Sequence, residues 1–161
     1  MADNNVVIWI SGLGGVLVGA IGVLVAIYVN RQQMKALTIS ANRQVWINNL
    51  RDEISSLISN LEVVSFSGLP QKTFTKDDVK IATLNILKHE AKIKLLLNPK
   101  EEDHARLVRV MHEALAVASA HKELYEMGDA ESGKLIENVG RIVGVSQEIL
   151  KREWERVKKR E

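Results

Sequence analysis

The chain has 161 residues, no cysteine and a formal net charge of +2 at pH 7. This length allows one compact domain with an appendage, the lack of cysteine excludes disulfides, thiolate metal ligands and a cysteine nucleophile, and the small net charge gives no indication of nucleic-acid binding. Hydrophobic residues make up 46% of the chain and aromatic residues only 4%, which favours helices rich in Leu, Ile, Val and Ala over a β-sandwich. The composition therefore predicts an all-α protein.

The first predicted element is an uncharged segment, residues 6–29. As a helix it would be roughly 36 Å long, enough to cross a hydrocarbon core of about 30 Å. Trp9 and Tyr28 lie near its two ends, where aromatic rings prefer the level of the lipid headgroups. A cleaved signal peptide is the alternative, but residues 1–5 lack the basic residues that precede the apolar run of such a peptide. The pattern predicts a transmembrane helix.

The charges that flank this segment predict its orientation. Asp3 is the only charged residue before it, whereas Arg31, Lys35 and Arg43 follow it. Because positively charged flanks stay in the cytoplasm, we expect residues 1–5 outside and residues 30–161 inside.

Small residues recur along the predicted span at steps of three and four: Gly12, Gly15, Gly19, Gly22 and Ala26. In water each glycine inside a helix costs about 0.8 to 1 kcal/mol relative to alanine. In lipid, such a stripe lets two helices approach closely. The chain has no second span, so we expect the partner to be another copy or another protein. The general frequency of glycine in membrane helices is the alternative explanation.

Four amphipathic segments follow the span. The first carries apolar residues at helical spacing and ends near Gly68 and Pro70, which break the pattern. Its core-facing residues are Ile47, Leu50, Ile54, Leu57, Leu61 and Val64. The second begins at Thr75, predicted to cap the helix together with Asp78. Its core-facing residues are Val79, Ala82, Ile86, Ile93 and Leu97.

The third segment has start signals in Asn98 as N-cap, Pro99 and Glu101. Its predicted core residues are Leu107, Met111, Ala114, Ala118 and Tyr125, and Gly128 is expected to end it. Asp129 is predicted to cap the last segment, whose apolar residues are Leu135, Val139, Ile142, Ile149, Trp154 and Val157. Short connections between these segments predict an antiparallel four-helix bundle over residues 30–161, with one member extended into the membrane.

Searches for catalytic motifs give weak signals. A di-iron bundle needs two Glu-x-x-His pairs, and only Glu101 with His104 fits, in a first turn expected to be solvated. His89 and His112 each start a His-Glu sequence but lack the second histidine of a zinc-protease helix. We therefore predict no catalytic residue, no metal and no cofactor. An enzyme would be distinguished by a bound metal or nucleotide in purified material.

The last eleven residues contain six basic and three acidic side chains. Glu148 with Arg152, and Glu155 with Lys159, have the favourable i, i+4 order for pairs within one helix. A solvated helix end is one interpretation. Contact with anionic lipid is the other, and it would bring five basic residues to one layer at the membrane: Arg31, Lys35, Lys158, Lys159 and Arg160.

Three motifs, RQVWINNLRDE, LLLNP and EWERVK, resemble a group of small single-pass membrane proteins encoded in bacterial genomes and prophages. The matching residues are Arg43, Gln44, Trp46, Leu50 and Arg51 in the first motif, and Glu153, Trp154, Glu155 and Arg156 in the last. The resemblance implies a helical module anchored in the bacterial inner membrane, of host or phage origin, and no reaction. Trp46 and Trp154 are expected to pack in one layer of the bundle.

Together these patterns predict a non-enzymatic, homo-oligomeric scaffold or interaction protein in contact with membrane lipid, with an unidentified protein as a further partner and no nucleic acid. The alternative is a pore-forming or membrane-perturbing effector, either holin-like or a phage-defence protein. No ionisable residue lies within the span, which argues against a selective ion channel.

Overall fold

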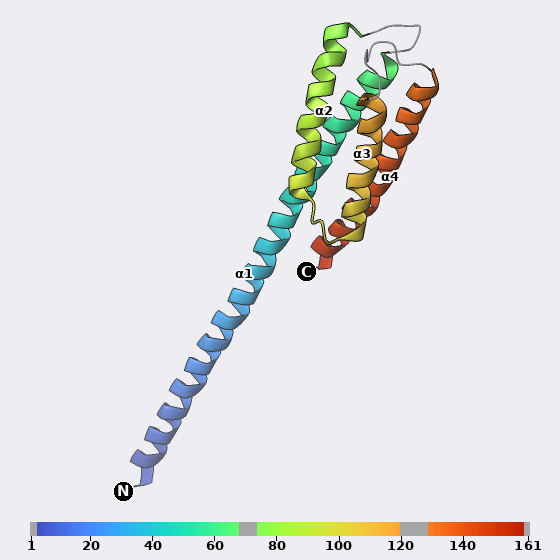
Figure 1. Ribbon diagram of the computed structural model, residues 1–161. Helices are drawn as coiled ribbons and strands as arrows, with labels where there is room; N and C mark the ends of the chain where they lie inside the picture. The colour runs from blue at the N-terminus through green and yellow to red at the C-terminus, as the bar shows by residue number, and fades with distance from the viewer. Residues whose placement is uncertain (1–2, 68–73, 120–128, 160–161) are drawn as a thin grey trace. The chain divides into compact units, whose positions relative to one another are not determined.

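The computed structural model describes the backbone of residues 3–67, 74–119 and 129–159, and the side chains of residues 21–67, 74–119 and 130–159. These residues form four helices and no strand (Figure 1). The helices are α1 (Asp3–Phe66), α2 (Lys76–Leu96), α3 (Glu102–Ser119) and α4 (Asp129–Lys159). The predicted all-α class is confirmed. The chain divides into two compact units, one of Met1–Asn42 with Arg160–Glu161 and the other of Arg43–Lys159.

In the first unit, apolar side chains of α1 are exposed on every face of the helix. Every residue from Ile21 to Val29 is exposed, and the exposed fraction reaches 67% at Leu24. Within the described part of the chain, no helical stretch combines the length and the apolar character needed to cross a membrane. The side chains of residues 6–20, which make up most of the predicted span, lie outside that part.

The second unit is an antiparallel four-helix bundle. Figure 1 shows the C-terminal part of α1 beside α2, α3 and α4, with each helix running opposite to the one before it. The core consists of the predicted stripes. The six predicted residues of α1 and the five predicted around α2 are all buried, as are Leu107, Met111, Ala114 and Ala118 of α3 and Leu135, Ile142 and Ile149 of α4. Helical periodicity therefore predicted these core residues correctly.

The start of α2 is fixed by the predicted cap. The backbone N–H of Asp78 donates to the Thr75 hydroxyl at 3.2 Å, and the backbone N–H of Thr75 donates to the Asp78 carboxylate at 2.8 Å. These reciprocal bonds satisfy two donors that the first turn leaves without partners. Hydrogen bonds from the Thr75 hydroxyl and backbone also hold the pKa of Asp78 below its ordinary value.

The predicted start of the next helix at Asn98 is wrong. Residues 98–101 form a turn, in which the N–H of Glu101 donates to the Asn98 carbonyl at 3.1 Å and the N–H of Lys100 donates to the Asn98 side chain at 3.1 Å. Pro99 occupies the second position of this turn, which its fixed φ suits. Helix α3 begins only at Glu102, and the carbonyl of Glu101 accepts its first bond, from Ala105, at 3.0 Å.

The prediction that Trp154 belongs to the core of α4 is also wrong. Its side chain is 43% exposed, whereas the neighbouring Glu153 is buried. Val139 and Val157 are half-buried. Glu153 takes the inward position because three arginines surround its carboxylate, as described below. Five other predicted features lie outside the described residues: Gly68, Pro70, Tyr125, Gly128 and the capping side chain of Asp129.

Pairs of polar or charged side chains join each helix of the bundle to both of its neighbours. They connect α1 to α2, α2 to α3, α3 to α4 and α4 back to α1, through Glu53 with His89 and Lys92, Glu90 with His112, Glu113 with Arg141, Glu148 with Arg106, and Glu153 with Arg43. The predicted pair of Glu148 with Arg152 within α4 is therefore wrong, because each of these side chains pairs with α3 instead. Glu155 pairs with Lys158, not with the predicted Lys159.

Candidate functional site

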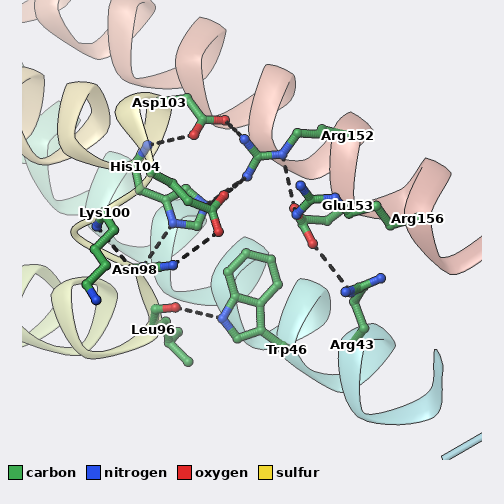
Figure 2. A network of polar contacts seen from close by, with 11 residues as sticks. Arg43, Trp46, Leu96, Asn98, Lys100, Asp103, His104, Arg152, Glu153 and Arg156 are labelled. Carbon is green, nitrogen blue, oxygen red and sulfur yellow. Dashed lines mark hydrogen bonds and ion pairs between the residues drawn. The ribbon is translucent and has the colours of Figure 1, made fainter. Parts of the chain in front are cut away.

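The densest polar cluster of the described residues lies at the end of the bundle that contains Arg43 and the last turns of α4 (Figure 2). We call it the Arg152 network. Its members come from α1, from α4, and from the start of α3 with the turn before it: Arg43, Trp46, Asn98, Glu101, Asp103, His104, Arg152, Glu153 and Arg156. All of them belong to the second unit, so their positions relative to one another are those of a single compact body.

Arg152 is the centre of this network. Its Nη1 lies 2.5 Å from Asp103 Oδ2, its Nη2 binds the carboxylate of Glu101, and its Nε donates to Glu153 at 3.1 Å. The planar guanidinium thus uses its donors on three carboxylates. Burial lowers the pKa of Arg152, but the hydrogen bonds to Asp103 and Glu153 outweigh it and raise the pKa. Burial likewise raises the pKa of Asp103, and the bond from Arg152 outweighs it and lowers the pKa.

Glu153 connects this cluster to α1. Besides Arg152, its carboxylate accepts a bond from Arg156 at 2.7 Å and lies 3.5 Å from the Nε of Arg43. Its side chain is only 7% exposed. Burying a carboxylate is costly unless opposite charges pair with it, and the three arginines supply them.

His104 and Trp46 form the inner wall of the cluster. His104 is 3% exposed, so the prediction of a solvated first turn is wrong. Its Nδ1 accepts the backbone N–H of Asn98 at 2.9 Å, and its Nε2 lies 3.3 Å from the Nη2 of Arg152. The indole of Trp46 stacks on this imidazole with ring centroids 6.0 Å apart, and its N–H donates to the carbonyl of Leu96 at 2.7 Å. Trp46 therefore packs against His104, whereas Trp154 lies at the surface with the Lys158 ammonium 5.9 Å from its ring.

The ligand set closest to a metal site in the described part of the chain is contained in this network. Ligand atoms of Glu101, Asp103 and His104 lie within 4.8 Å of one another. The guanidinium of Arg152 already binds both carboxylates, so the chain supplies its own cation at this position. Three arginines face three carboxylates across the network, and this balance leaves no excess charge to attract a ligand. The ion pairs of the network hold α1, the start of α3 and the end of α4 together.

An open groove of about 690 Å³ lies beside the network. Charged side chains line it: Glu101, Glu102, Asp103, Arg106, Glu148, Arg152 and Arg156. Arg106 pairs with Glu148, and Arg152 and Arg156 pair within the network. Most charges of the groove are therefore paired, and among the described residues only Glu102 of this lining forms no ion pair.

The sequence contains a signal for this network that catalytic motifs do not include. The core stripes of three helices each end on a polar residue: Arg43 lies four residues before Ile47, His104 three before Leu107, and Glu153 four after Ile149. Because the helices alternate in direction, these three ends meet at the same end of the bundle. Polar residues in core positions there must pair with each other.

The small residues predicted to pack against another helix in the membrane are described only at Gly22 and Ala26. Gly12, Gly15 and Gly19 lie outside the described side chains, as does Trp9. A Cβ added to Gly22 would meet no atom within 4 Å, and Ala26 is exposed. Within the first unit nothing in the described chain fills the space beside Gly22.

The residues predicted at the membrane interface lie on exposed surfaces wherever they are described. The Tyr28 hydroxyl accepts a bond from Gln32 at 2.8 Å, and Arg31 and Lys35 are exposed. Lys158 pairs with Glu155 at 2.9 Å, and this pairing holds the pKa of Glu155 below its ordinary value. Lys159 is exposed, and Arg160 lies outside the described residues.

The chain matches no protein-family model, and no curated protein or solved structure is similar to it. The resemblance to single-pass membrane proteins of bacteria and prophages stays a prediction.

Proposed function

We propose that this protein is a non-enzymatic, membrane-anchored interaction protein that assembles with copies of itself through its first helix. The observation that carries the proposal is the uniform exposure of Ile21–Val29, a stretch without any charged residue. Exposed apolar surface costs about 25 cal/mol for each Å². A helix that is apolar on all faces is stable when lipid or protein surrounds it.

The sequence on the N-terminal side of this stretch supports a bilayer as that environment. Residues 6–20 are also uncharged, and together with residues 21–29 they complete the length that a span requires. The flanking charges favour the cytoplasmic side for the bundle. The inner membrane of a bacterium, of host or phage origin, is the location that the sequence resemblance implies.

The spacing of small residues in α1 supports assembly. Positions 12, 15, 19, 22 and 26 share one helix face, and the space beside Gly22 is open to a second helix. At one end of the bundle, the charges of the Arg152 network neutralise one another. This balance favours a structural or binding role of the bundle over catalysis.

Membrane anchoring is tested by fractionating bacteria that produce the full chain. We expect the protein to remain in membranes washed with alkaline carbonate and to dissolve in detergent. Leu24→Arg should release part of it, because an arginine inside a span costs about 2.5 to 3.5 kcal/mol. Leu37→Arg is the matched control, since Leu37 is exposed on the same helix beyond the uncharged stretch. Recovery of the parent protein in the carbonate wash would contradict membrane anchoring.

Assembly is tested by native mass spectrometry of the protein extracted from membranes. Replacement of both Gly15 and Gly19 by Leu should shift the assembly to smaller species, because the added side chains separate the backbones. Ala20→Leu adds the same kind of bulk away from the small-residue face and should leave the mass unchanged. An unchanged mass in the double variant would contradict the proposed packing. Retention of dye by liposomes that carry the protein is expected, and leakage would favour the pore-forming alternative.

A further inference from the structure

Helix α2 has two apolar faces, and only one of them is used by the bundle. Val79, Ala82, Ile86 and Ile93 face the core. The opposite side carries a second stripe at helical spacing, which we call the outer face of α2: Ile81, Leu84, Leu87, Ala91 and Leu95. The exposed fraction is 60% at Leu84 and 87% at Leu95, the highest among the exposed large apolar residues.

This clustering distinguishes the outer face of α2 from the rest of the bundle surface. The other exposed large apolar residues of the second unit are scattered singly over the other helices: Val45, Phe66, Ile136 and Trp154. Scattered apolar residues are normal on a protein surface, whereas a contiguous stripe marks an interaction surface.

The charges beside the stripe indicate what it binds. Lys80 and Lys88 lie four residues before and four residues after Leu84, about 12 Å apart along the helix, and both are exposed. None of the described side chains forms an ion pair with either of them. Lys92 and Lys94 also lie near the stripe, but Glu53 and Glu90 neutralise them. The outer face therefore carries two uncompensated positive charges, Lys80 and Lys88, among its apolar side chains.

A hollow extends this surface at its C-terminal end. It lies between α1 and α2, has a volume of about 440 Å³, and is lined by Asn49, Asp52, Glu53, Lys92, Leu95 and Leu96. Leu95 and Leu96 supply the apolar side chains of its lining, so it offers space for a bulky apolar side chain next to the stripe.

We infer that the outer face of α2 binds an amphipathic helix of a partner protein, with an apolar stripe flanked by Asp or Glu. Such a helix matches both the leucines and the two lysines. A second copy that presented the same face would bring Lys80 and Lys88 against lysines, which charge repulsion opposes. The inference rests on the proposed function, because it names the partner class of a bundle that serves interaction.

The test uses the full chain in lipid nanodiscs. The chain contains no cysteine, so Ala91→Cys places a single thiol on the outer face. The probe is a synthetic amphipathic helix with a leucine stripe flanked by glutamates, and its control has lysines in place of the glutamates. The readout is the rate at which N-ethylmaleimide alkylates the thiol.

We expect the glutamate peptide to slow alkylation at least tenfold at saturation, while the lysine peptide leaves the rate unchanged. Leu84→Glu should weaken binding of the glutamate peptide by at least about tenfold, or 1.4 kcal/mol. Ile136→Glu, at an exposed apolar position of α4, should leave it intact. Replacing Lys80 and Lys88 by Glu should transfer the preference to the lysine peptide.

Three results would overturn the inference. Slower alkylation in nanodiscs of phosphatidylglycerol than in nanodiscs of phosphatidylcholine, without peptide, would identify lipid as the occupant. A rate that falls as the protein concentration rises would identify a second copy. No protection by the glutamate peptide would show that the face does not bind such a helix. The Leu84→Glu variant should still be anchored and assembled as the parent is, so failure here is distinguishable from failure of the proposed function.

Discussion

Arg152 of α4 and Asp103 of α3 are joined by a 2.5 Å contact between Nη1 and Oδ2, although they lie 49 positions apart in the chain. The same guanidinium binds Glu101 and Glu153, so one side chain holds the start of α3 against the last turns of α4.

Removing this side chain should destabilise the bundle. Arg152→Met leaves the partly buried carboxylates of Glu101 and Asp103 close together without their cation, and we expect a loss of about 2 kcal/mol in the free energy of unfolding. Urea unfolding of the detergent-solubilised chain, followed by circular dichroism, measures it. The control Lys151→Met removes an exposed neighbouring charge and should change stability by less than about 0.5 kcal/mol. Equal effects of the two substitutions would show that the network contributes nothing to the free energy of unfolding.

The two tryptophans near this end of the bundle should respond differently to the same substitution. Trp46→Phe removes the donor to the Leu96 carbonyl, a 2.7 Å bond between α1 and the end of α2, and should cost about 1 kcal/mol. Trp154 is exposed, so Trp154→Phe should stay within about 0.5 kcal/mol of the parent. Chemical denaturation of both variants checks this. A larger loss for Trp154 would contradict the arrangement described above.

Glu53 should contribute to the acid sensitivity of the bundle. The hydrogen bond from Lys92 and the contact with His89 outweigh burial and lower its pKa below the ordinary 4.5. The unfolded chain therefore takes up this proton at a higher pH than the folded chain does. The stabilisation is complete above pH 4.5 and is lost as pH falls through the lower pKa of the folded state.

Glu53→Gln should therefore make the unfolding free energy less dependent on pH below about 4.5, the unfolded-state value. Denaturation curves between neutral pH and acid measure the slope. Asp52→Asn is the matched control, since its carboxylate is exposed and forms no ion pair among the described residues. If both variants keep the parent slope, the pair of Glu53 with α2 is unimportant for acid stability.

The N-cap of α2 should contribute measurably to the free energy of unfolding. Thr75→Ala removes the hydroxyl that accepts the N–H of Asp78, and we expect a loss of about 1 kcal/mol. The control Ser59→Ala also deletes a hydroxyl, but one that donates to the carbonyl of Ser55 within α1. That change should leave stability the same or slightly higher, because alanine is the better helix former. Thermal unfolding of the two variants distinguishes them.

The sequence was sufficient to predict features that depend on nearby residues. The stripe from Ile47 to Val64 follows helical periodicity, and Thr75 caps a helix through a residue three positions away. Asn98 shows the limit of such signals, because the same asparagine and Pro99 suit a helix start and a turn equally well. The structure uses them in a turn, and α3 begins four residues later.

The Arg152 network could not be assembled from local patterns. Its bonds between helices join residues 50 or more positions apart, or nearly so. The same charges at i, i+4 spacing gave the wrong partners for Glu148 and Arg152. Glu53 likewise finds Lys92 and His89 on another helix. Which neighbour a surface charge meets depends on how the helices are arranged, and the apolar stripes alone do not determine that.

The circuit of side-chain pairs around the bundle has a consequence for its handedness. Four helices of alternating direction can wind around one core clockwise or anticlockwise, and the same apolar stripes fill the centre in both cases. In the mirror-related winding each helix exchanges its left and right neighbours. Glu53 would then lose His89 and Lys92, Glu90 would lose His112, and Glu153 would lose Arg43. The charged flanks of the helices thus select one of two topologies that the hydrophobic effect does not distinguish.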